Sequence, residues 1–373
     1  TEVTVRQEVS YGTSQVRVRA GVDWLWNGYD ISLRLPASQS TGERGGRQST
    51  SVNPEAAAQN GSFYSPALWA DAVMRPLKKL ELVAGARLDF FRQYVDRDGE
   101  RERNRLDTTV TPRLNARYKF SDAVTVKAAA GTTSQAAQPQ QLADAPFGNP
   151  SLQAQRSFET TLGTEVQLTD AIDVDVQVFD KQLWNLVVPG EDFSGPLYSN
   201  DGTGRVFGAE VLLRHRPVGR FFGWVGYTLQ RATRVDRPGE PERLFGWDQT
   251  HIFTALGSYK LPENWEIGTR WRYVTGTPYT DVVGAIWNDD NDTWQRTSSA
   301  CTNCARLPSF HQLDVRVDKK FVFDTWMLGV YLDVQNAYNR ANPEAIAYSF
   351  DASERSVTSG LPIIPSFGVR GEF

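Results

Sequence analysis

Apolar and polar residues alternate with a period of two over much of this chain. Between 172 and 178, isoleucine or valine occupies every even position, and aspartate or glutamine occupies every odd one. The segments 124–128 and 313–318 follow the same pattern. Because successive side chains of a β-strand point to opposite faces, we expect each segment to form a strand with one apolar and one polar face.

Fifteen segments are expected to form strands. They are about 1–10, 14–35, 64–76, 79–96, 107–119, 122–133, 157–169, 171–190, 204–216, 220–233, 248–261, 264–278, 308–322, 325–338 and 364–373. The segment 14–35 contains Asn27-Gly28, a strong turn dipeptide, and could hold a hairpin. We favour one long strand there, because a hairpin would break the pattern of connections between the strands.

The connections between these segments alternate between short and long. Short links at 77–80, 121–122, 169–170, 217–219, 262–264 and 323–324 separate long polar stretches at 36–63, 96–106, 132–156, 189–203, 233–246, 279–307 and 339–362. A transmembrane β-barrel has short periplasmic turns at one end and long extracellular loops at the other. A soluble sandwich has no reason to sort its connections in this way. The pattern therefore predicts an all-β protein whose residues 1–373 form an antiparallel up-and-down transmembrane β-barrel.

The composition narrows the class of protein further. The chain of 373 residues has 23% charged residues and a mean hydropathy of −0.44. It contains no run of 18 apolar residues, so any membrane span must consist of strands. Aromatic residues make up 12% of the chain, as expected if rings form girdles at the two membrane interfaces. The net charge of −4 argues against nucleic acid as a partner.

The last segment ends on an aromatic residue. Phe367, Val369 and Phe373 fall on one face of the expected strand 364–373. An exposed terminal phenylalanine would be odd in a soluble protein. In a barrel, Phe373 would place its ring at the periplasmic interface, and we expect it to act as a signal to the barrel assembly machinery. Counting back from Phe373 puts every short link on the periplasmic side and every long loop outside the cell.

Five short segments carry motifs that occur in a fixed order. They read FGNPSLQAQRS at 147–157, GARLD at 85–89, FGAE at 207–210, RLPSFHQLDVRV at 306–317 and DVQNAYN at 333–339. In order and spacing they resemble motifs of the C-terminal barrel region of TonB-dependent outer-membrane receptors. The first departs from the family pattern G-N-P-x-L-x-P-E-x-S at Ala154 and Gln155. Each motif alone is weak, but their order and the terminal Phe373 make the resemblance specific.

The resemblance implies an outer-membrane receptor of a Gram-negative bacterium. Such receptors have an N-terminal plug domain, a short box that engages the TonB-type energy coupler, and a barrel of 22 strands. The fifteen expected strands would be about two-thirds of that barrel, and no plug or coupling box is visible in 1–373. We expect the N-terminal plug and barrel portion to belong to the same receptor, whole or split. The alternative is a complete barrel of 14 or 16 strands.

The two cysteines and the three histidines are candidates for metal chemistry. Cys301 and Cys304 form a single C-x-x-C pair in one long loop, without a second pair for zinc or a βαβ setting for redox chemistry. A disulfide that staples this loop is favoured, and it implies an oxidising compartment. His215, His251 and His311 are far apart and share no metal-ligand spacing, so we favour plain strand positions for them.

Aromatic residues in the long loops are the candidates for ligand contact. Trp287 and Trp294 flank the acidic run 288–292, and exposed rings can stack on a planar or polar solute. The two rings could equally fold back onto the barrel rim. Phe147 and Asn149, in the loop 132–156, are further candidates.

Acidic and lumenal residues give weaker signals. Asp289, Asp290 and Asp292 offer the oxygen ligands that Ca²⁺ takes, but the EF-hand spacing is missing and a solvated acidic loop is favoured. The polar residues of 113–117 and 173–175 are expected to line the lumen and hold the plug. No catalytic set, phosphate-binding loop or cofactor motif stands out, so no cofactor is expected.

Together these features predict a receptor that binds a scarce solute, such as a metal chelate or an oligosaccharide, and imports it with energy from the TonB system. Expected partners are outer-membrane lipid, the plug portion, the energy coupler, the barrel assembly machinery and the solute. Three alternatives stay open. They are a passive porin-like channel, a soluble all-β binding protein, and a barrel enzyme of lipase or protease type with His251 or His311 as its base.

Overall fold

The computed structural model describes residues 1–31, 59–97, 100–103, 106–139, 141–142, 148–190, 197–289 and 293–373. Within these ranges nearly all regular structure is β, and the single exception is a short 3₁₀ helix, η2 (Pro262–Asn264). None of the helical structure in these ranges is long and apolar enough to cross a membrane.

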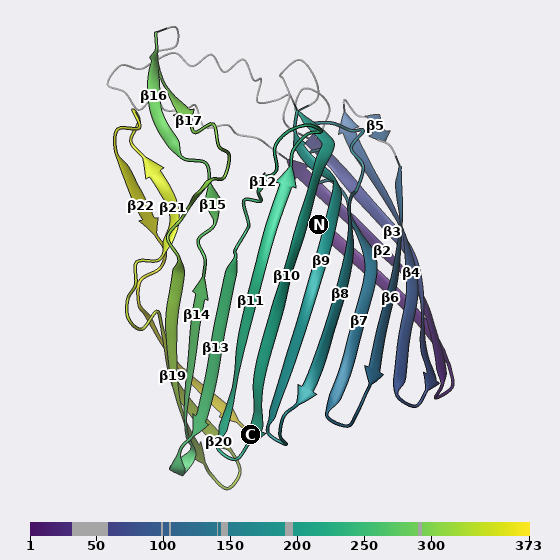
Figure 1. Cartoon of the computed structure of the whole chain (residues 1–373), viewed down its shortest axis with the longest axis vertical. Coiled ribbons are helices and arrows are strands. Elements are labelled where there is room, and N and C mark those ends of the chain that lie inside the picture. The colour runs from purple at the N-terminus through teal and green to yellow at the C-terminus, as the bar shows by residue number, and fades with distance from the viewer. Residues whose placement is uncertain are drawn as a thin grey trace.

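Fifteen long strands, counted over the described ranges, form one antiparallel sheet (Figure 1). They are β1 (Glu2–Gly12), β2 (Val16–Ile31), β3 (Gln59–Leu77), β4 (Leu80–Arg97), β6 (Asp107–Lys119), β7 (Val124–Gln135), β8 (Gln155–Gln167), β9 (Ile172–Pro189), β10 (Tyr198–Val218), β11 (Phe221–Val235), β13 (His251–Lys260), β14 (Trp265–Val274), β19 (Phe310–Val322), β20 (Met327–Gln335) and β23 (Ile364–Glu372). The short β5 (Glu100–Arg103) and β12 (Arg243–Leu244) join the same sheet. The fifteen expected strands are confirmed, and β2 runs through Asn27-Gly28 without a hairpin.

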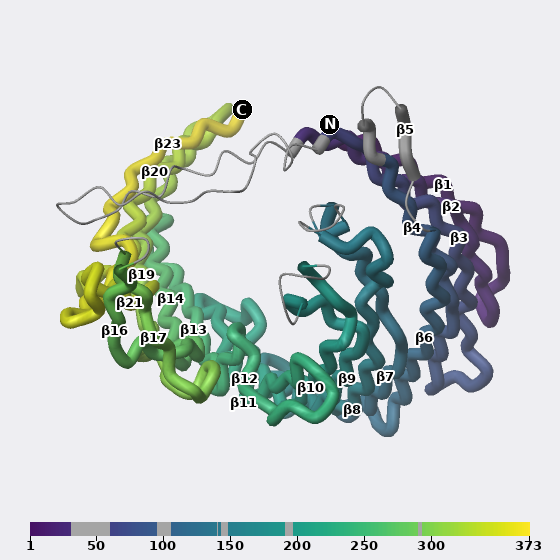
Figure 2. The backbone as a smooth tube through the Cα atoms, turned by 90° about the horizontal axis from the view of Figure 1, so that it is seen from above, coloured from purple at the N-terminus to yellow at the C-terminus, as the bar shows by residue number. Residues whose placement is uncertain are grey.

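Each long strand pairs with its neighbours in the chain, so the sheet is a simple meander. Seen from above, the wall curves into an arc with β1 near one end and β23 at the other (Figure 2). Among the described residues, β1 is paired with β2 alone and β23 with β20 alone. The described part of the wall therefore has two sheet edges.

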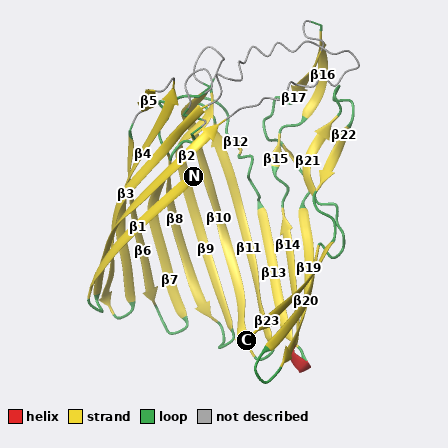
Figure 3. Cartoon of the chain, turned by 180° about the vertical axis from the view of Figure 1, so that it is seen from behind, coloured by secondary structure: helices red, strands yellow, loops and turns green. Residues whose placement is uncertain are grey.

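Short and long connections lie at opposite ends of the wall, as Figure 3 shows. The short ones are 13–15, 78–79, 120–123, 168–171, 219–220, 261–264 and 323–326. Gly219, with φ of 71°, takes the left-handed conformation that the tight β10–β11 turn requires. We call this end the turn end and the opposite one the loop end. The sorting of connections by length is therefore confirmed.

The alternation gives the wall an apolar outer face. The register places Leu162 of β8 opposite Val178 of β9, Val178 opposite Ala209 of β10, and Ala209 opposite Leu229 of β11. Leu162, Val178 and Leu229 are all exposed. A row of aliphatic side chains across four strands, three of them exposed, is what a barrel presents to lipid.

Two of the long loops contain hairpins that the sequence pattern did not predict. In the loop 279–307, β16 (Val282–Asn288) pairs with β17 (Thr293–Ser298), and β15 (Pro278–Tyr279) pairs with β18 (Ala305–Arg306). In the loop 339–362, β21 (Pro343–Tyr348) pairs with β22 (Arg355–Ser359). Both hairpins stand above the wall at the loop end (Figure 1).

A charge on the outer face should destabilise the barrel far more than a charge on the inner face. We expect Val178→Lys to lower the free energy of unfolding by about 2–4 kcal/mol, because Val178 lies near the middle of the apolar band. Gln177→Lys is the matched control, since Gln177 faces inward and donates to Glu210. Urea unfolding in lipid vesicles measures both, and equal losses would contradict the assignment of the faces.

Candidate ligand-binding surface at the loop end

The two loop hairpins meet through an aromatic cluster. Trp287 and Trp294 stand opposite each other across the β16–β17 ladder, with ring centroids 5.6 Å apart in an edge-to-face arrangement. Phe350, which follows β21, packs edge-on against Trp294 at 6.4 Å. Trp287, Trp294 and Phe350 remain 42%, 39% and 51% exposed. The cluster therefore holds its rings in place and still presents them to solvent.

Polar contacts join the same two hairpins. Arg296 of β17 donates from Nη2 to the carbonyl oxygens of Tyr348, at 3.2 Å, and Ser349, at 3.3 Å. The Tyr348 hydroxyl donates to Asp281 Oδ1 at 2.5 Å and accepts from the Val282 backbone N–H at 3.3 Å. The bond to Asp281 raises the pKa of Tyr348, because ionisation would break it and place two negative charges side by side.

Sequence analysis named the two tryptophans but missed their partners. Phe350, Tyr348 and Arg296 carry no motif, and the first two lie in a different loop from the tryptophans. The signal within the sequence was the placement of Trp287 and Trp294 on either side of one short polar run, which is typical of an aromatic pair across a hairpin.

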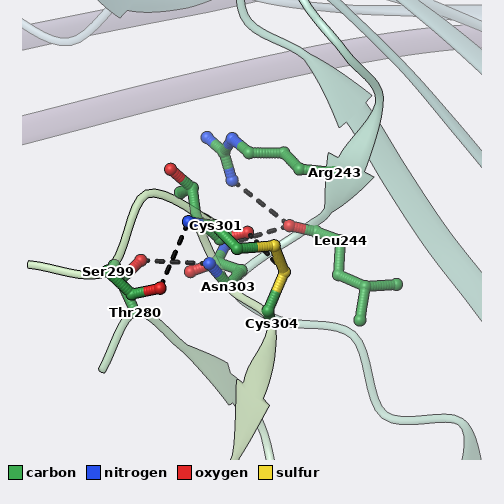
Figure 4. Close-up of a disulfide and its surroundings, with 8 residues drawn as sticks. Arg243, Leu244, Thr280, Ser299, Cys301, Asn303 and Cys304 are labelled. Carbon is green, nitrogen blue, oxygen red and sulfur yellow. Dashed lines mark hydrogen bonds between the residues drawn. A yellow bond between two sulfur atoms is a disulfide. The ribbon is translucent and has the colours of Figure 1, made fainter. Parts of the chain in front are cut away.

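The C-x-x-C pair closes a small loop at the base of the β16–β17 hairpin. Cys301 and Cys304 are joined by a disulfide, and Asn303 between them has a φ of 59° (Figure 4). Asn303 donates from its backbone N–H to Thr280 Oγ1 at 3.0 Å and from Nδ2 to the Leu244 carbonyl at 2.9 Å. The disulfide loop thus attaches the hairpin to the segment around β12.

A buried ion pair holds the loop end of the wall together beneath this loop. The side chain of Asp248 is 0% exposed, and that of its partner Arg306, the first residue of the motif 306–317, is 27% exposed. Asp248 also accepts from the Ala232 backbone N–H of β11 at 2.6 Å. Arg306 donates from Nη1 to the Gly276 carbonyl, just beyond β14, at 3.0 Å. The pair therefore links β11, the end of β14 and β18.

Gly276 permits the close approach at this point. A Cβ atom at Gly276 would lie 1.8 Å from the carbonyl oxygen of Leu307, so no other residue fits. The two stems of the long loop are consequently held against each other where they leave the wall.

Asn149, a candidate for ligand contact in the loop before β8, makes hydrogen bonds that hold this loop in place. Asn149 donates from Nδ2 to the Tyr198 carbonyl of β10 at 2.9 Å, and its Oδ1 accepts from the Ser151 N–H at 2.9 Å. Leu152 is buried against Ala137 and Leu142. This part of the chain lies inside the arc of the wall (Figure 2). Asn149 therefore shapes the loop, and Phe147 lies outside the described residues.

The inner wall carries paired charges from strand to strand. Lys127 of β7 lies 2.6 Å from Asp175 of β9, and Asp71 of β3 lies 2.8 Å from Arg19 and 3.3 Å from Arg113. Near the turn end of β13, β14, β19, β20 and β23, the inner face holds a hollow of about 770 Å³. Its lining includes Arg270, Asp314, Arg316, Tyr331, Asp333 and Glu372. The lumen is thus polar and lined by groups that can hydrogen-bond a solute or another protein segment.

The remaining candidates do not come together. His251 meets the Tyr227 hydroxyl at 2.8 Å and His311 the Tyr338 hydroxyl at 2.7 Å, while His215 packs on an aromatic ring. No group of three or more His, Cys, Asp and Glu residues suited to a metal occurs in the described ranges. Asp290 and Asp292 lie outside those ranges, so the calcium suggestion that they share with Asp289 stays a prediction.

The C-terminal aromatic residue lies at the turn end. Phe373 is fully exposed and stacks on Trp326 with ring centroids 6.0 Å apart. Trp326 in turn stacks on Phe323 at 4.5 Å. These rings form an aromatic patch beside the β19–β20 turn, which suits the interface of a membrane.

Residues 3–337 match the family model described as "TonB dependent receptor-like, beta-barrel". The chain belongs to the TonB-dependent receptor family. This receptor barrel is therefore an outer-membrane protein, with its turn end toward the periplasm and its loop end outside. No curated protein matches the sequence.

Solved structures of other receptors share the fold. The FrpB iron transporter of Neisseria meningitidis (F3-3 variant) is 16% identical with a TM-score of 0.65, covering 98% of this chain and 53% of that one. The unliganded ferric citrate transporter FecA is 15% identical with a TM-score of 0.67, and the match covers 100% of this chain and 54% of FecA. The copper transporter OprC is 13% identical with a TM-score of 0.67, and the match covers 99% of this chain and 56% of OprC. The chain spans about half the length of these proteins.

Breaking the buried pair should loosen the loop above it. We expect Asp248→Asn to destabilise the loop end of the wall by about 2–3 kcal/mol, because Arg306 loses its counter-charge and the Ala232 N–H its strongest acceptor. Limited proteolysis within 276–307 should then be at least tenfold faster. The control is Asp324→Asn at the turn end, and an unchanged cleavage rate for Asp248→Asn would show that the pair does not hold the loop.

The Tyr348 hydroxyl should ionise later than an ordinary tyrosine. Its raised pKa means that the bond to Asp281 stabilises the paired hairpins below about pH 10 and is lost as the pH rises through the higher folded value. The ultraviolet difference spectrum between the parent and Tyr348→Phe should show a midpoint above about pH 10. Asp281→Asn should lower that midpoint, and no change on this substitution would contradict the assignment.

Proposed function

We propose that this receptor binds a scarce solute at its loop end and passes it into the periplasm with energy from a TonB-type coupler. The observation that carries the proposal is the half-exposed aromatic cluster of Trp287, Trp294 and Phe350, held above a polar inner wall. Rings fixed by a hairpin lose little conformational freedom when a ligand stacks on them.

A metal chelate is the solute class that we favour over an oligosaccharide. The similar structures include an iron transporter, a ferric citrate transporter and a copper transporter. The cluster adds a reason from this chain itself, because its edge-to-face rings offer flat apolar surface to a chelate with planar groups. The Arg296 guanidinium beside it would favour a ligand with negative charge.

The wall is proposed to be closed by further strands. In hydrocarbon, an unpaired backbone N–H or C=O costs several kcal/mol, so the unpaired edges of β1 and β23 need partners. We assign these partners to the N-terminal plug and barrel portion of the same receptor. The paired charges of the inner wall would hold the plug, and Phe373 would be read by the barrel assembly machinery of a Gram-negative outer membrane.

Removing the Trp287 ring from the aromatic cluster should weaken solute binding. With a ferric catecholate and ferric citrate as probes, we expect Trp287→Ala to weaken binding of the catecholate by about tenfold, through loss of stacking area, and to change binding of citrate, which has no ring, much less. Isothermal titration of the reconstituted full-length receptor measures the change. Ile286→Ala is the matched control, because Ile286 lies on the other face of β16. Equal binding of the catecholate by the parent and Trp287→Ala would remove the cluster from the site, and binding of neither probe would refute the metal-chelate class.

A further inference from the structure

Three arginines stand on the outer face of the wall above its apolar row. Arg231 of β11 is two residues beyond Leu229, Arg205 of β10 is four beyond Ala209, and Arg156 of β8 is six beyond Leu162. Because these separations are even, the arginines point to the same side as the aliphatic row that crosses β8–β11. We call Arg156, Arg205 and Arg231 the arginine rim.

The height of the rim corresponds to the outer boundary of the membrane. Arg205 precedes Val218, at the turn end of β10, by thirteen residues. At about 3.3 Å per residue and a tilt of about 40°, Arg205 lies about 33 Å above the turn end. The apolar band of such barrels is about 25 Å tall, so Arg205 falls in the headgroup layer of the outer leaflet.

The rim has more positive charge than its surroundings neutralise. Arg205 donates from Nε to Asp180 at 2.6 Å and lies over the Phe207 ring at 5.0 Å. Arg156 donates from Nη2 to the Thr108 carbonyl at 3.4 Å. Arg231, opposite Phe207 in the ladder, is exposed and has no hydrogen bond or ion pair with any described residue. Three guanidinium groups thus face one carboxylate.

We propose that the arginine rim binds the phosphates of a phosphorylated glycolipid in the outer leaflet, with its acyl chains along the aliphatic row below. Guanidinium groups pair with phosphate in a two-pronged geometry, and the exposed leucine and valine side chains complement hydrocarbon. Arg156 and Arg205, two strands and two residues apart, lie about 12 Å from each other, which suits a headgroup that carries two phosphates on a disaccharide. The proposal rests on the outer-membrane location of the barrel and not on its transport function.

The test measures binding of diphosphorylated lipid A to the reconstituted full-length receptor by native mass spectrometry. We expect the variant Arg156→Gln/Arg205→Gln/Arg231→Gln to bind it at least tenfold more weakly, and the same lipid stripped of phosphate to bind the parent equally weakly. The double variant Arg205→Gln/Arg231→Gln spares the half-buried Arg156 and should show most of the loss. The control Lys78→Gln/Lys79→Gln/Arg220→Gln removes the same charge at the turn end and should bind like the parent.

The outcomes separate a lipid site from a general attraction to anions. Inorganic phosphate at millimolar concentration should not displace the lipid, since it lacks the acyl chains. Displacement by inorganic phosphate, undiminished binding by both rim variants, or an equal loss in the turn-end control would each overturn the proposal. Solute binding by the rim variants should match that of the parent, so failure of this inference is distinguishable from failure of the proposed function.

Discussion

The constraint on which this structure depends is that backbone N–H and C=O groups cannot be left unpaired in hydrocarbon. A meander of long antiparallel strands satisfies them strand by strand, and among the described residues each long strand from β1 to β23 pairs with its neighbours in the chain. Once the ladder is fixed, the two-residue period leaves no choice of face, so aliphatic side chains line the outside and paired charges the inside. The loops and their side chains are therefore supported by a wall whose strand pairing is already fixed.

Family motifs in this chain prove to be anchors at the loop end. Arg306 neutralises the buried Asp248, and Asn149 ties its loop to β10. Asn336, buried and with a φ of 53°, donates from Nδ2 to the carbonyls of Arg340, at 2.9 Å, and Leu361, at 3.2 Å. These side chains supply the hydrogen bonds that the sheet cannot offer where the chain leaves it. The motif residues therefore hold the loops that carry the exposed rings.

Features that depend on residues close together in the sequence were predicted correctly, and contacts between residues far apart in the sequence were not. The strands were predictable because their alternation is local, and the path of β2 through Asn27-Gly28 followed from the order of connections. Trp287 and Trp294 were named from their setting, but Trp294 packs on Phe350, a residue of another loop more than fifty positions further along the chain. The same holds for Asn303, whose contact with Leu244 spans 59 positions. No local pattern encodes such contacts.

The sequence by itself determined that the chain is a membrane barrel, how its strands follow one another, and which end carries the long loops, because period, turn length and strand order are local properties. Only the tertiary structure decided that the aromatic rings form one cluster across two hairpins, and that Asp248 is buried under Arg306. It also showed that three arginines from β8, β10 and β11 lie on the outer face above the same aliphatic row. Register between strands brings together residues that the sequence keeps apart, and register is set by the whole ladder.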